Sequence, residues 1–491
     1  MGSGIAQIAA LAGHPVKLLD AREGAAASAI KGISTQLNKL ADKGKLTPDA
    51  AQAAAARLSV ADNVSELADA ALVVEAIVED LAAKQALFVS LDEFVGSDAI
   101  LATNTSSISI TAIGAALKRP ERLAGLHFFN PAPLMPLVEI VSGIGTDASV
   151  ADTLFATAKA WGKTPVHARS TPGFIVNRVA RPYYAEALRL LQEGAADVAT
   201  IDAVMREAGG FKMGPFELMD LIGHDVNFAV TRSVWTAFFH DTRFTPSLIQ
   251  QELLEGGFLG RKTGRGFYDY REGAVKLSAA TGAPRTLNAA ITLHGNGEVA
   301  TALATRLSNA GTPFSADASA SDERLATVGD AVVLMTDGRS ATQRASESGI
   351  ANTVLIDLAL EYATTTRIAM SCAQQCAPAA RDHAIAMLQA AGLQVSLMKD
   401  IPGLAVMRTV AMLANEAADA VNQGVCSAAD VDAAMRLGVN YPRGPLAWAE
   451  QIGLYSVRDV LLNLSMSTGE DRYRISPLIQ QACYAGGSLH E

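Results

Sequence analysis

The chain has 491 residues, too many for a single ordinary domain, and 49% of them are apolar, which is enough to build several hydrophobic cores. Its formal net charge of −10 argues against general nucleic-acid binding. No apolar run reaches the ~20 residues of a membrane span, so no membrane partner is expected. The four cysteines lack the paired spacing of a metal site, so we predict no metal and reduced thiols in a cytoplasmic protein.

The first predicted elements are a helix from Gly2, a glycine-containing turn, and a strand that ends in Asp20. A carboxylate at such a strand end can bond the ribose hydroxyls of NAD and repel the 2′-phosphate of NADP. A solvated strand-end residue is an equally good interpretation of Asp20 taken alone.

A later segment, Ala290–Gly297, reads as a strand running into a glycine turn, and no counterpart precedes Gly2. We therefore expect that the first strand of the dinucleotide fold is missing here. Either Met1 is not the native start or the chain has been shortened at this end.

The stretch Thr103–Ser107 follows a short apolar strand. Open α/β sheets place their ligands at the carboxyl ends of strands, so this stretch is a candidate binding segment. The alternative is that one of its hydroxyls only caps the next helix.

A histidine and a glutamate lie inside two neighbouring apolar strands, His127 in the first and Glu139 in the second. A buried glutamate is costly without a partner, and histidine is a natural one. A carboxylate that holds one ring nitrogen leaves the other to take a hydroxyl proton while hydride leaves the carbon. Alone, His127 would read as a core histidine and Glu139 as the solvent face of an edge strand. Together they predict a catalytic pair.

Residues 174–191 carry apolar side chains at helical spacing, and a polar Asn177 lies inside this run. A buried amide needs a partner, which is either a substrate or a neighbouring backbone group. The same pattern returns at 404–421. Ser170–Arg178 resembles Asp400–Arg408, and the match continues at a constant offset of 230 as far as Gly257 and Gly487.

The upstream halves also match, although less closely, with short apolar strands that alternate with helices. We predict an α/β Rossmann-type domain with a parallel, doubly wound sheet, followed by an all-α C-terminal domain, with the pair duplicated in a degenerate second copy. The expected domains are residues 1–168 (Rossmann-type, first strand missing), 169–272 (helical), 284–398 (degenerate Rossmann-like) and 399–491 (second helical).

The second copy departs from the first at the positions that carry chemistry. Matching Arg122–Ala124 with Arg367–Ala369 aligns His127 with Cys372, and the offset of 230 aligns Asn177 with Met407. We predict that the second copy is catalytically silent. We also predict that its helical domain packs on the first and forms an intrachain pseudo-dimer.

The motifs of the first copy resemble those of the 3-hydroxyacyl-CoA dehydrogenases across residues 1–270. They are Met1–Gln7, Val74–Glu79, Asn104–Ser107, Gly125–Pro131, Thr171–Arg178, Met213–Leu218 and Lys262–Tyr268. The duplicated layout is similar to the long bacterial forms that act on 3-hydroxybutyryl-CoA or 3-hydroxyadipyl-CoA. The resemblance implies NAD as cofactor and an acyl-CoA thioester as substrate.

The resemblance also implies roles for individual residues. His127 is the general base, Glu139 orients it, and Ser106 and Asn177 bond the substrate oxygens. The positions that match NAD contacts are Gly2, Asp20, Glu79, Lys84, Ser106, Asn130 and Lys262. Those that match CoA contacts are Gln36 and Lys43, on a helical arm that would otherwise be an ordinary solvated helix, together with Ser106.

The expected activity is reversible, NAD-dependent oxidation of an L-3-hydroxyacyl-CoA to the 3-ketoacyl-CoA, in fatty-acid β-oxidation or phenylacetate breakdown. Two rivals stay open. One is a catalytically impaired scaffold that binds CoA or a nucleotide, because the phosphate loop lacks its strand. The other is a dehydrogenase of free 3-hydroxyacids. The sequence decides neither the acyl-chain length nor whether the protein is a homo-oligomer.

Overall fold

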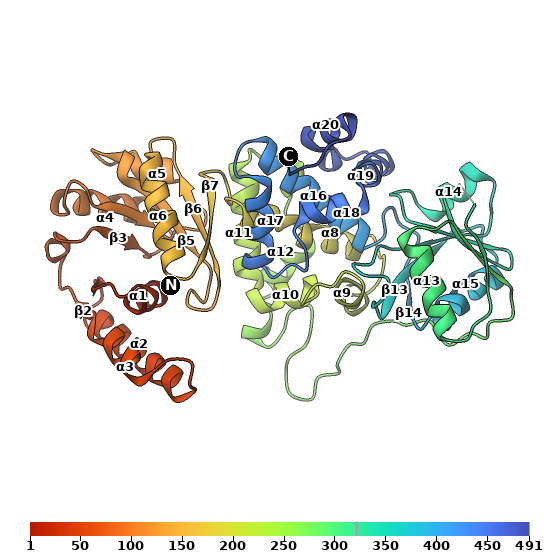
Figure 1. Ribbon diagram of the computed structural model, residues 1–491, viewed down its shortest axis with the longest axis horizontal. Helices are drawn as coiled ribbons and strands as arrows, with labels where there is room; N and C mark the ends of the chain where they lie inside the picture. Colours follow the sequence, from red (N-terminus) through yellow and green to blue (C-terminus); the bar gives the residue numbers. More distant parts are fainter. Residues whose placement is uncertain (320–322, 491) are drawn as a thin grey trace. The chain divides into compact units, whose positions relative to one another are not determined.

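The computed structural model describes residues 1–319 and 323–490. The chain forms two compact units, Met1–Arg178 with Gln423–Val439, and Val179–Asn422 with Asn440–Glu491 (Figure 1). Within the described residues, no helix is both long and apolar enough to cross a membrane.

The first unit is built on a five-stranded sheet in the order β3-β4-β5-β6-β7. All neighbours run parallel except β5 and β6, which are antiparallel. The sequence predicted a parallel sheet throughout. The difference arises because the segment between β5 and β6 is too short for the crossover that a parallel connection needs. The strands are β3 Leu72–Glu75, β4 Ile100–Thr103, β5 Leu123–Phe128, β6 Leu137–Ser142 and β7 Thr164–Arg169.

Helices cover this sheet, and their apolar faces form its core. Ile5 and Ile8 of the first helix and Leu154 of α6 pack with Leu126 and Ile140 of the strands. This arrangement confirms the Rossmann-type domain that the sequence predicted. The helices of the domain are α1 Gly2–Leu11, α4 Leu81–Phe94, α5 Ile110–Gly114 and α6 Ala148–Ala160.

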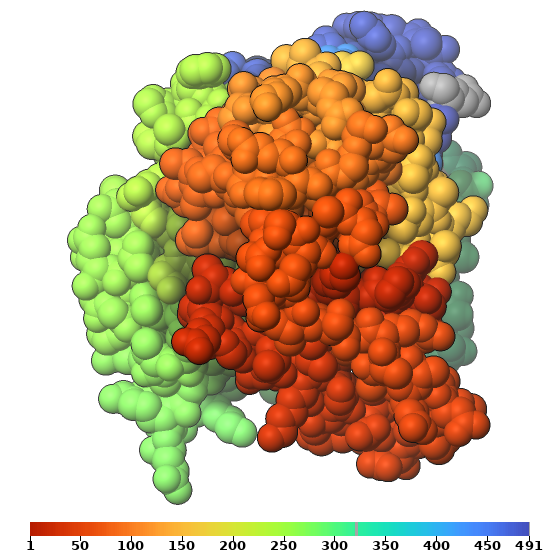
Figure 2. Space-filling model, turned by 90° about the vertical axis from the view of Figure 1, so that its left-hand side faces the viewer, coloured from red at the N-terminus to blue at the C-terminus, as the bar shows by residue number. Residues whose placement is uncertain are grey.

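Two further helices, α2 (Ala25–Asp42) and α3 (Pro48–Ala56), form an arm that leaves the rest of the unit (Figure 1). Ile33 and Leu37 of α2 pack against Ala51 and Ala54 of α3. The arm joins β1 (Val16–Leu18) to β2 (Leu58–Val60), which pair as a separate two-stranded parallel sheet. Figure 2 shows the solvent-facing surface of this N-terminal region, coloured red to orange.

The second unit contains the predicted helical C-terminal domain. Its longest helix, α16, is buried along most of its length and packs against α8, α18, α19 and α20. The helices of this part are α8 Arg181–Gln192, α9 Val198–Glu207, α10 Pro215–Ile222, α11 His224–Ala237, α12 Leu248–Glu255, α16 Val406–Asn422, α18 Pro445–Ile452, α19 Leu454–Thr468 and α20 Pro477–Ala485.

The second unit also holds a seven-stranded sheet in the order β14-β13-β12-β11-β10-β8-β9. Its strands are β8 Ile291–His294, β9 Ser315–Asp317, β10 Arg324–Val328, β11 Ala331–Met335, β12 Thr353–Ile356, β13 Arg367–Cys372 and β14 Gln394–Leu397. Its helices are α13 Glu298–Asn309, α14 Ala341–Ser348 and α15 Pro378–Ala390.

The strand registers of the two sheets correct the sequence alignment of His127. In the first sheet Gly125 pairs with Val141 across β5 and β6, and in the second Leu355 pairs with Ser371 across β12 and β13. Each residue of the first pair is related to one of the second pair by the offset of 230 that also relates the helical regions. His127 therefore corresponds to Asp357, and the predicted match with Cys372 was wrong. Short apolar strands resemble each other in many registers, and only the hydrogen-bonded ladder decides among them.

Candidate active site

His127 and Glu139 face each other across the antiparallel pair β5 and β6, where they are direct register partners. The His127 Nδ1 atom lies 2.5 Å from Glu139 Oε2. Glu139 is fully buried and His127 is 5% exposed. Side chains directly opposite on neighbouring strands share one face of the sheet, so the ladder itself brings the pair together.

The second carboxylate oxygen of Glu139 is also satisfied. Glu139 Oε1 accepts hydrogen bonds from the backbone amides of Ile175 at 3.1 Å and Val176 at 2.9 Å. A buried carboxylate without such partners would be strongly unfavourable. The glutamate thus links the histidine to the start of α7 (Val176–Val179), the helical turn that carries Asn177.

This geometry assigns the histidine a chemical task. With Nδ1 held by a carboxylate, Nε2 of His127 is the ring nitrogen that can take a proton from a substrate. A carboxylate in this position can fix the tautomer of the ring and stabilise an imidazolium.

Two aromatic rings enclose the imidazole of His127. The centroid of Phe129 lies 4.6 Å from it and that of Phe174 lies 5.8 Å from it. Phe174 has a backbone φ of 48°, in the left-handed region that a bulky residue rarely adopts. The same strain recurs in the second copy, so it belongs to the repeated fold and not to the surroundings of His127 alone. Sequence reasoning missed this residue, although Leu404 occupies the equivalent position of the repeat with a φ of 52°.

The hydroxyl cluster after β4 is organised by Glu79. Its Oε1 atom accepts from Thr105 Oγ1 at 2.7 Å and from the amides of Ser106 at 2.9 Å and Ser107 at 3.0 Å. Burial raises the pKa of Glu79, but the hydrogen bonds from Thr105 and Ser106 outweigh it and hold the pKa below its ordinary value. The following helix α5 is capped by Ser109 instead. The N-cap alternative therefore does not account for Ser106.

The structure brings Ser106 and Asn177 together. The Asn177 Nδ2 atom donates to the backbone oxygen of Ser106 at 3.4 Å, a long hydrogen bond. Asn104, from the same stretch, accepts from the Phe128 amide at 2.8 Å and so ties the cluster to the end of the His127 strand. Lys84 is buried beside the cluster, 2.7 Å from Glu75 and 3.4 Å from Glu79. The sequence analysis placed Asn104 in the candidate binding segment without a role of its own, and it gave Glu75 no role.

The other predicted cofactor and CoA positions are spread over several elements. Asp20 is exposed just beyond β1, where its Oδ1 accepts from the Arg22 amide at 2.9 Å. Asn130 is exposed just beyond β5. Lys262 belongs to the second unit and pairs there with Asp225 of α11. Gln36 and Lys43 are exposed on the α2 arm.

The first unit offers features that fit a bound dinucleotide. The helix α1 begins at Gly2 with no side-chain cap, so its first amides can meet a pyrophosphate. The exposed Asp20 carboxylate fits the hydroxyls of a ribose.

The second copy keeps a carboxylate at the histidine position but uses it differently. Asp357 is fully buried and accepts from the amides of Ala405 at 2.9 Å, Val406 at 2.7 Å and Met407 at 3.0 Å. The amides of Ala405 and Val406 are the counterparts of those of Ile175 and Val176, which Glu139 binds in the first copy, and Ala369 takes the place of Glu139. Asp357 therefore occupies the position of His127 and accepts amide hydrogen bonds like those of Glu139, and no His–Glu pair remains at this place in the second copy.

We predict that Asp357→Ala destabilises the protein by about 2–4 kcal/mol, because it leaves several buried amides without an acceptor. Burial raises the pKa of Asp357 to about 6 in the folded chain, despite its backbone hydrogen bonds. The stabilisation from a raised pKa is fully present below the ordinary pKa of 3.8 and is lost as the pH rises through about 6. Urea unfolding should therefore show that Asp357→Ala lowers the free energy of unfolding more at pH 5 than at pH 7.5. An equal decrease at both pH values would contradict this prediction.

The fold and the site define an NAD-dependent dehydrogenase with a Rossmann-type domain and a helical domain. Family models match the chain as 3-hydroxyacyl-CoA dehydrogenase, NAD binding domain (residues 1–171) and C-terminal domain (residues 173–270 and 403–488). Residues 333–402 match a 3-hydroxybutyryl-CoA dehydrogenase reduced Rossmann-fold domain. The chain belongs to the 3-hydroxyacyl-CoA dehydrogenase family, the NAD-dependent oxidoreductases that interconvert 3-hydroxyacyl-CoA and 3-ketoacyl-CoA.

Individual relatives agree with this assignment. The 3-hydroxyadipyl-CoA dehydrogenase of Escherichia coli is 44% identical over 98% of this chain and 95% of its own length. A crystal structure of 3-hydroxybutyryl-CoA dehydrogenase from Escherichia coli K12 covers 99% of this chain and 96% of its own, with a TM-score of 0.89 and 43% identity. The mitochondrial hydroxyacyl-coenzyme A dehydrogenase of Sus scrofa is 42% identical over 55% of this chain and 88% of its own length.

Proposed function

We propose that His127 is the general base in the reversible oxidation of an L-3-hydroxyacyl-CoA by this chain. The observation that carries the proposal is the 2.5 Å contact between His127 Nδ1 and the buried Glu139. NAD, when bound, supplies the hydride acceptor. His127 takes the hydroxyl proton at Nε2, and Ser106 and Asn177, which meet at this site, bond the substrate oxygen and orient the reacting carbon.

The relatives' names point to the substrate class. One relative is named for 3-hydroxyadipyl-CoA and one solved structure for 3-hydroxybutyryl-CoA. The substrate is thus a short 3-hydroxyacyl-CoA, in fatty-acid or phenylacetate-type degradation. Gln36 and Lys43 on the exposed arm are proposed contacts for its CoA portion. The four cysteines are free, which fits a cytoplasmic location.

The direct test follows NADH absorbance with acetoacetyl-CoA as substrate. Turnover that depends on both compounds supports the proposal. Binding of NADH or CoA without turnover would favour the scaffold alternative instead. Reduction of free acetoacetate but not of its CoA ester would favour the dehydrogenase of free 3-hydroxyacids.

We predict that Asp20→Ala raises the KM for NADH by about tenfold, with a much smaller change in kcat, because one charge-assisted pair of hydrogen bonds to the ribose is lost. The variant should also accept NADPH better than the unaltered chain does, since the carboxylate no longer repels the 2′-phosphate. Steady-state kinetics with both cofactors measures this, and Asp98→Ala, an exposed position just before β4, serves as control. An unchanged ratio of NADH to NADPH preference would remove Asp20 from the cofactor site.

We further propose that the second copy has become a structural partner of the first, in place of a second subunit. Contacts between the helical regions support this. Tyr473 Oη donates to Glu186 at 2.9 Å, and at the equivalent positions of the repeat Arg243 Nη1 donates to Glu416 at 3.0 Å. Each copy thus contacts the same position of the other copy, as is typical of a two-fold interface.

Within the first unit, a helix of the second copy supports the catalytic strands. Helix α17 (Ala428–Gly438) packs against β6 and β7. A Cβ on Gly438 would lie 2.7 Å from the Leu137 side chain of β6 and 3.1 Å from that of Val176, so a larger residue would have to displace these side chains. The second copy thus packs against the strand that carries Glu139, and it contributes no second His–Glu pair.

A further inference from the structure

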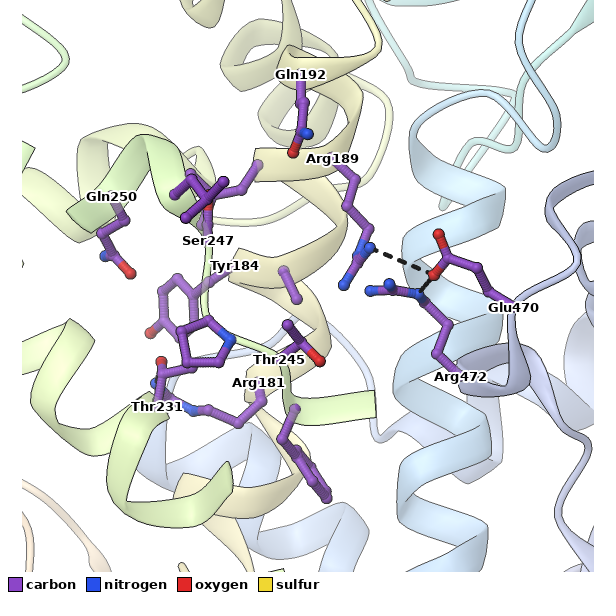
Figure 3. Close-up of a pocket in the computed structure, with 15 residues that line it drawn as sticks. Arg181, Tyr184, Arg189, Gln192, Thr231, Thr245, Ser247, Gln250, Glu470 and Arg472 are labelled. Atoms are coloured by element: carbon purple, nitrogen blue, oxygen red, sulfur yellow. Dashed lines mark hydrogen bonds and ion pairs between the residues drawn. The ribbon is translucent and has the colours of Figure 1, made fainter. Parts of the chain in front are cut away.

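Two features of the second unit have no part in the proposed dehydrogenase chemistry. The first is a cavity of about 270 Å³ that is lined by three arginines, Arg181, Arg189 and Arg472, and by Glu470 (Figure 3). Arg189 and Arg472 both pair with Glu470, and Arg189 Nε also lies 3.8 Å from Glu186. Arg189 and Arg472 thus belong to an ion-pair network of the helical region.

The second feature is a pair of cysteines at the end of one strand of the seven-stranded sheet. Cys372 ends β13, and Cys376 lies two residues before the start of α15 at Pro378 (Figure 1). The Cys372 thiol donates a hydrogen bond to the Cys376 sulfur, and both side chains are partly exposed. Two thiols in such contact can form a bond through rotation of their side chains.

The backbone between the two cysteines is held in a defined turn. The Cys376 amide donates to the Ala373 oxygen at 3.0 Å, and the Ala373 amide donates to the Thr353 oxygen of β12 at 3.0 Å. On the helix side of the turn, the Ala377 amide donates to Asn352 Oδ1 at 2.9 Å. A fixed turn keeps the two thiols near one another, which gives each a high effective concentration toward the other.

Comparison of the two copies shows that the fold does not require thiols at these positions. At the offset of 230, the two cysteines replace Ser142 and Thr146. The Thr146 hydroxyl holds the turn of the first copy, because it accepts from the Gly143 amide at 2.9 Å and donates to the Leu123 oxygen at 2.6 Å. In the second copy the two equivalent backbone groups bond each other directly, so its turn closes without a side chain. Both hydroxyls have thus been exchanged for thiols that the turn does not need.

The two thiols differ in how easily they ionise. Burial raises the pKa of Cys372 to about 12. Burial also raises the pKa of Cys376, but the hydrogen bond from Cys372 and the charge and backbone amide of Arg381, in α15, oppose this increase. A thiolate is the nucleophile in thiol–disulfide exchange, so Cys376 is the better attacking group and Cys372 the resolving one.

We propose that Cys372 and Cys376 form a redox modification site, at which the two thiols close a reversible disulfide by exchange with a small disulfide such as oxidised glutathione. Cys376, as the thiolate, attacks one sulfur of the small disulfide, forms a mixed disulfide with it and releases one thiolate. Cys372 then loses its proton to water and attacks the Cys376 sulfur, which releases the second thiolate. Two protein thiols are oxidised, and one small disulfide is reduced to two thiols.

Oxidation of the full chain by glutathione disulfide, followed by alkylation in denaturant and trypsin digestion, tests the proposal without requiring turnover. Trypsin releases residues 368–381 as one peptide that contains both cysteines of the pair and no other cysteine. Mass spectrometry should show that this peptide has lost two hydrogen atoms, resists alkylation, and recovers both thiols on reduction. Cys426 and Cys483, which lie on other peptides, are internal controls, and the pair should oxidise about tenfold faster than either of them.

Single-cysteine variants test the order of attack. Cys372→Ser should leave Cys376 with glutathione as a stable mixed disulfide, because no second thiol displaces it. Cys376→Ser should take up glutathione at Cys372 roughly tenfold more slowly, since that thiol ionises less readily. Cys426→Ser, which leaves the pair intact, is the matched control and should oxidise like the unaltered chain.

The proposal is overturned if residues 368–381 keep two alkylatable thiols, which is the result expected of cysteines that only fill space as small apolar side chains. Glutathione on this peptide without an internal disulfide, or oxidation of Cys426 and Cys483 as fast as that of the pair, would also overturn it. Equal glutathione uptake by Cys372→Ser and Cys376→Ser would show that Cys376 is not the preferred attacking thiol. None of these results depends on dehydrogenase turnover, so the proposed function is tested separately.

Discussion

Replacing His127 with glutamine is expected to lower kcat by about 10²–10⁴-fold, because the proposed general base is lost. Glutamine is close in size and can still hydrogen-bond Glu139, so the strand pair β5 and β6 should persist. It cannot take a proton at neutral pH. Steady-state reduction of acetoacetyl-CoA by NADH measures the loss, and NADH affinity from fluorescence quenching should stay nearly unchanged.

A second histidine in the same sheet provides the control. His167 of β7 stacks on Phe155 with ring centroids 4.6 Å apart and takes no part in the His127–Glu139 contact. We expect His167→Gln to keep kcat within about twofold, as substitutions away from the chemistry usually do. If His127→Gln retained a near-full rate while folding normally, His127 would not be the base and the proposed mechanism would fail.

Replacing Arg408 with alanine is expected to destabilise the second unit by about 3–5 kcal/mol, the usual result of removing one partner of a buried ion pair. Arg408 is 1% exposed, and its guanidinium reaches Glu186 at 2.7 Å and Glu193 at 2.7 and 2.8 Å. Burial lowers the pKa of Arg408, but the carboxylates Glu186 and Glu193 outweigh it and raise the pKa. The charge therefore persists in the folded state, and its removal leaves Glu186 buried without this cation. The midpoint of urea unfolding measures the effect.

Two further variants separate charge from packing. Arg408→Lys keeps the charge but loses the forked geometry, so it should fall between Arg408→Ala and the unaltered chain. Adding Glu186→Gln to Arg408→Ala removes the stranded carboxylate and should recover part of the stability. A loss below about 1 kcal/mol for Arg408→Ala, as for an exposed pair, would show that this contact does not hold the two helical copies together.

Much of the fold could be predicted from the sequence because its signals are local. Helical spacing in residues 174–191 and 404–421, and short apolar strands between helices, depend only on residues close in the chain. The pairing of His127 with Glu139 was also predictable, since two polar residues inside adjacent apolar strands must find partners, and each is the nearest candidate for the other.

Features that depend on contacts between residues distant in the chain were not predicted correctly from the sequence. The match of His127 with Cys372 was wrong because the register of β12 against β13 is set by hydrogen bonds between distant strands, and apolar strands look alike when slid along one another. The antiparallel pairing of β5 with β6 follows from the short segment between them, and the prediction of a parallel sheet overlooked this local feature. The cavity of the second unit could not be found either, because its lining combines residues 181–192 with 470–472, which are neighbours only in the folded chain.

The sequence by itself determined the class of fold, the repeat and the histidine–glutamate pair, because each depends on local pattern or on a constant offset. Only the tertiary structure decided that Asp357 replaces the histidine of the second copy, that Phe129 and Phe174 enclose His127, and that three arginines share one cavity. The physical reason is common to all three. They depend on strand register, strained backbone and the packing of distant helices, which follow from the free energy of the whole chain and leave no local trace in the sequence.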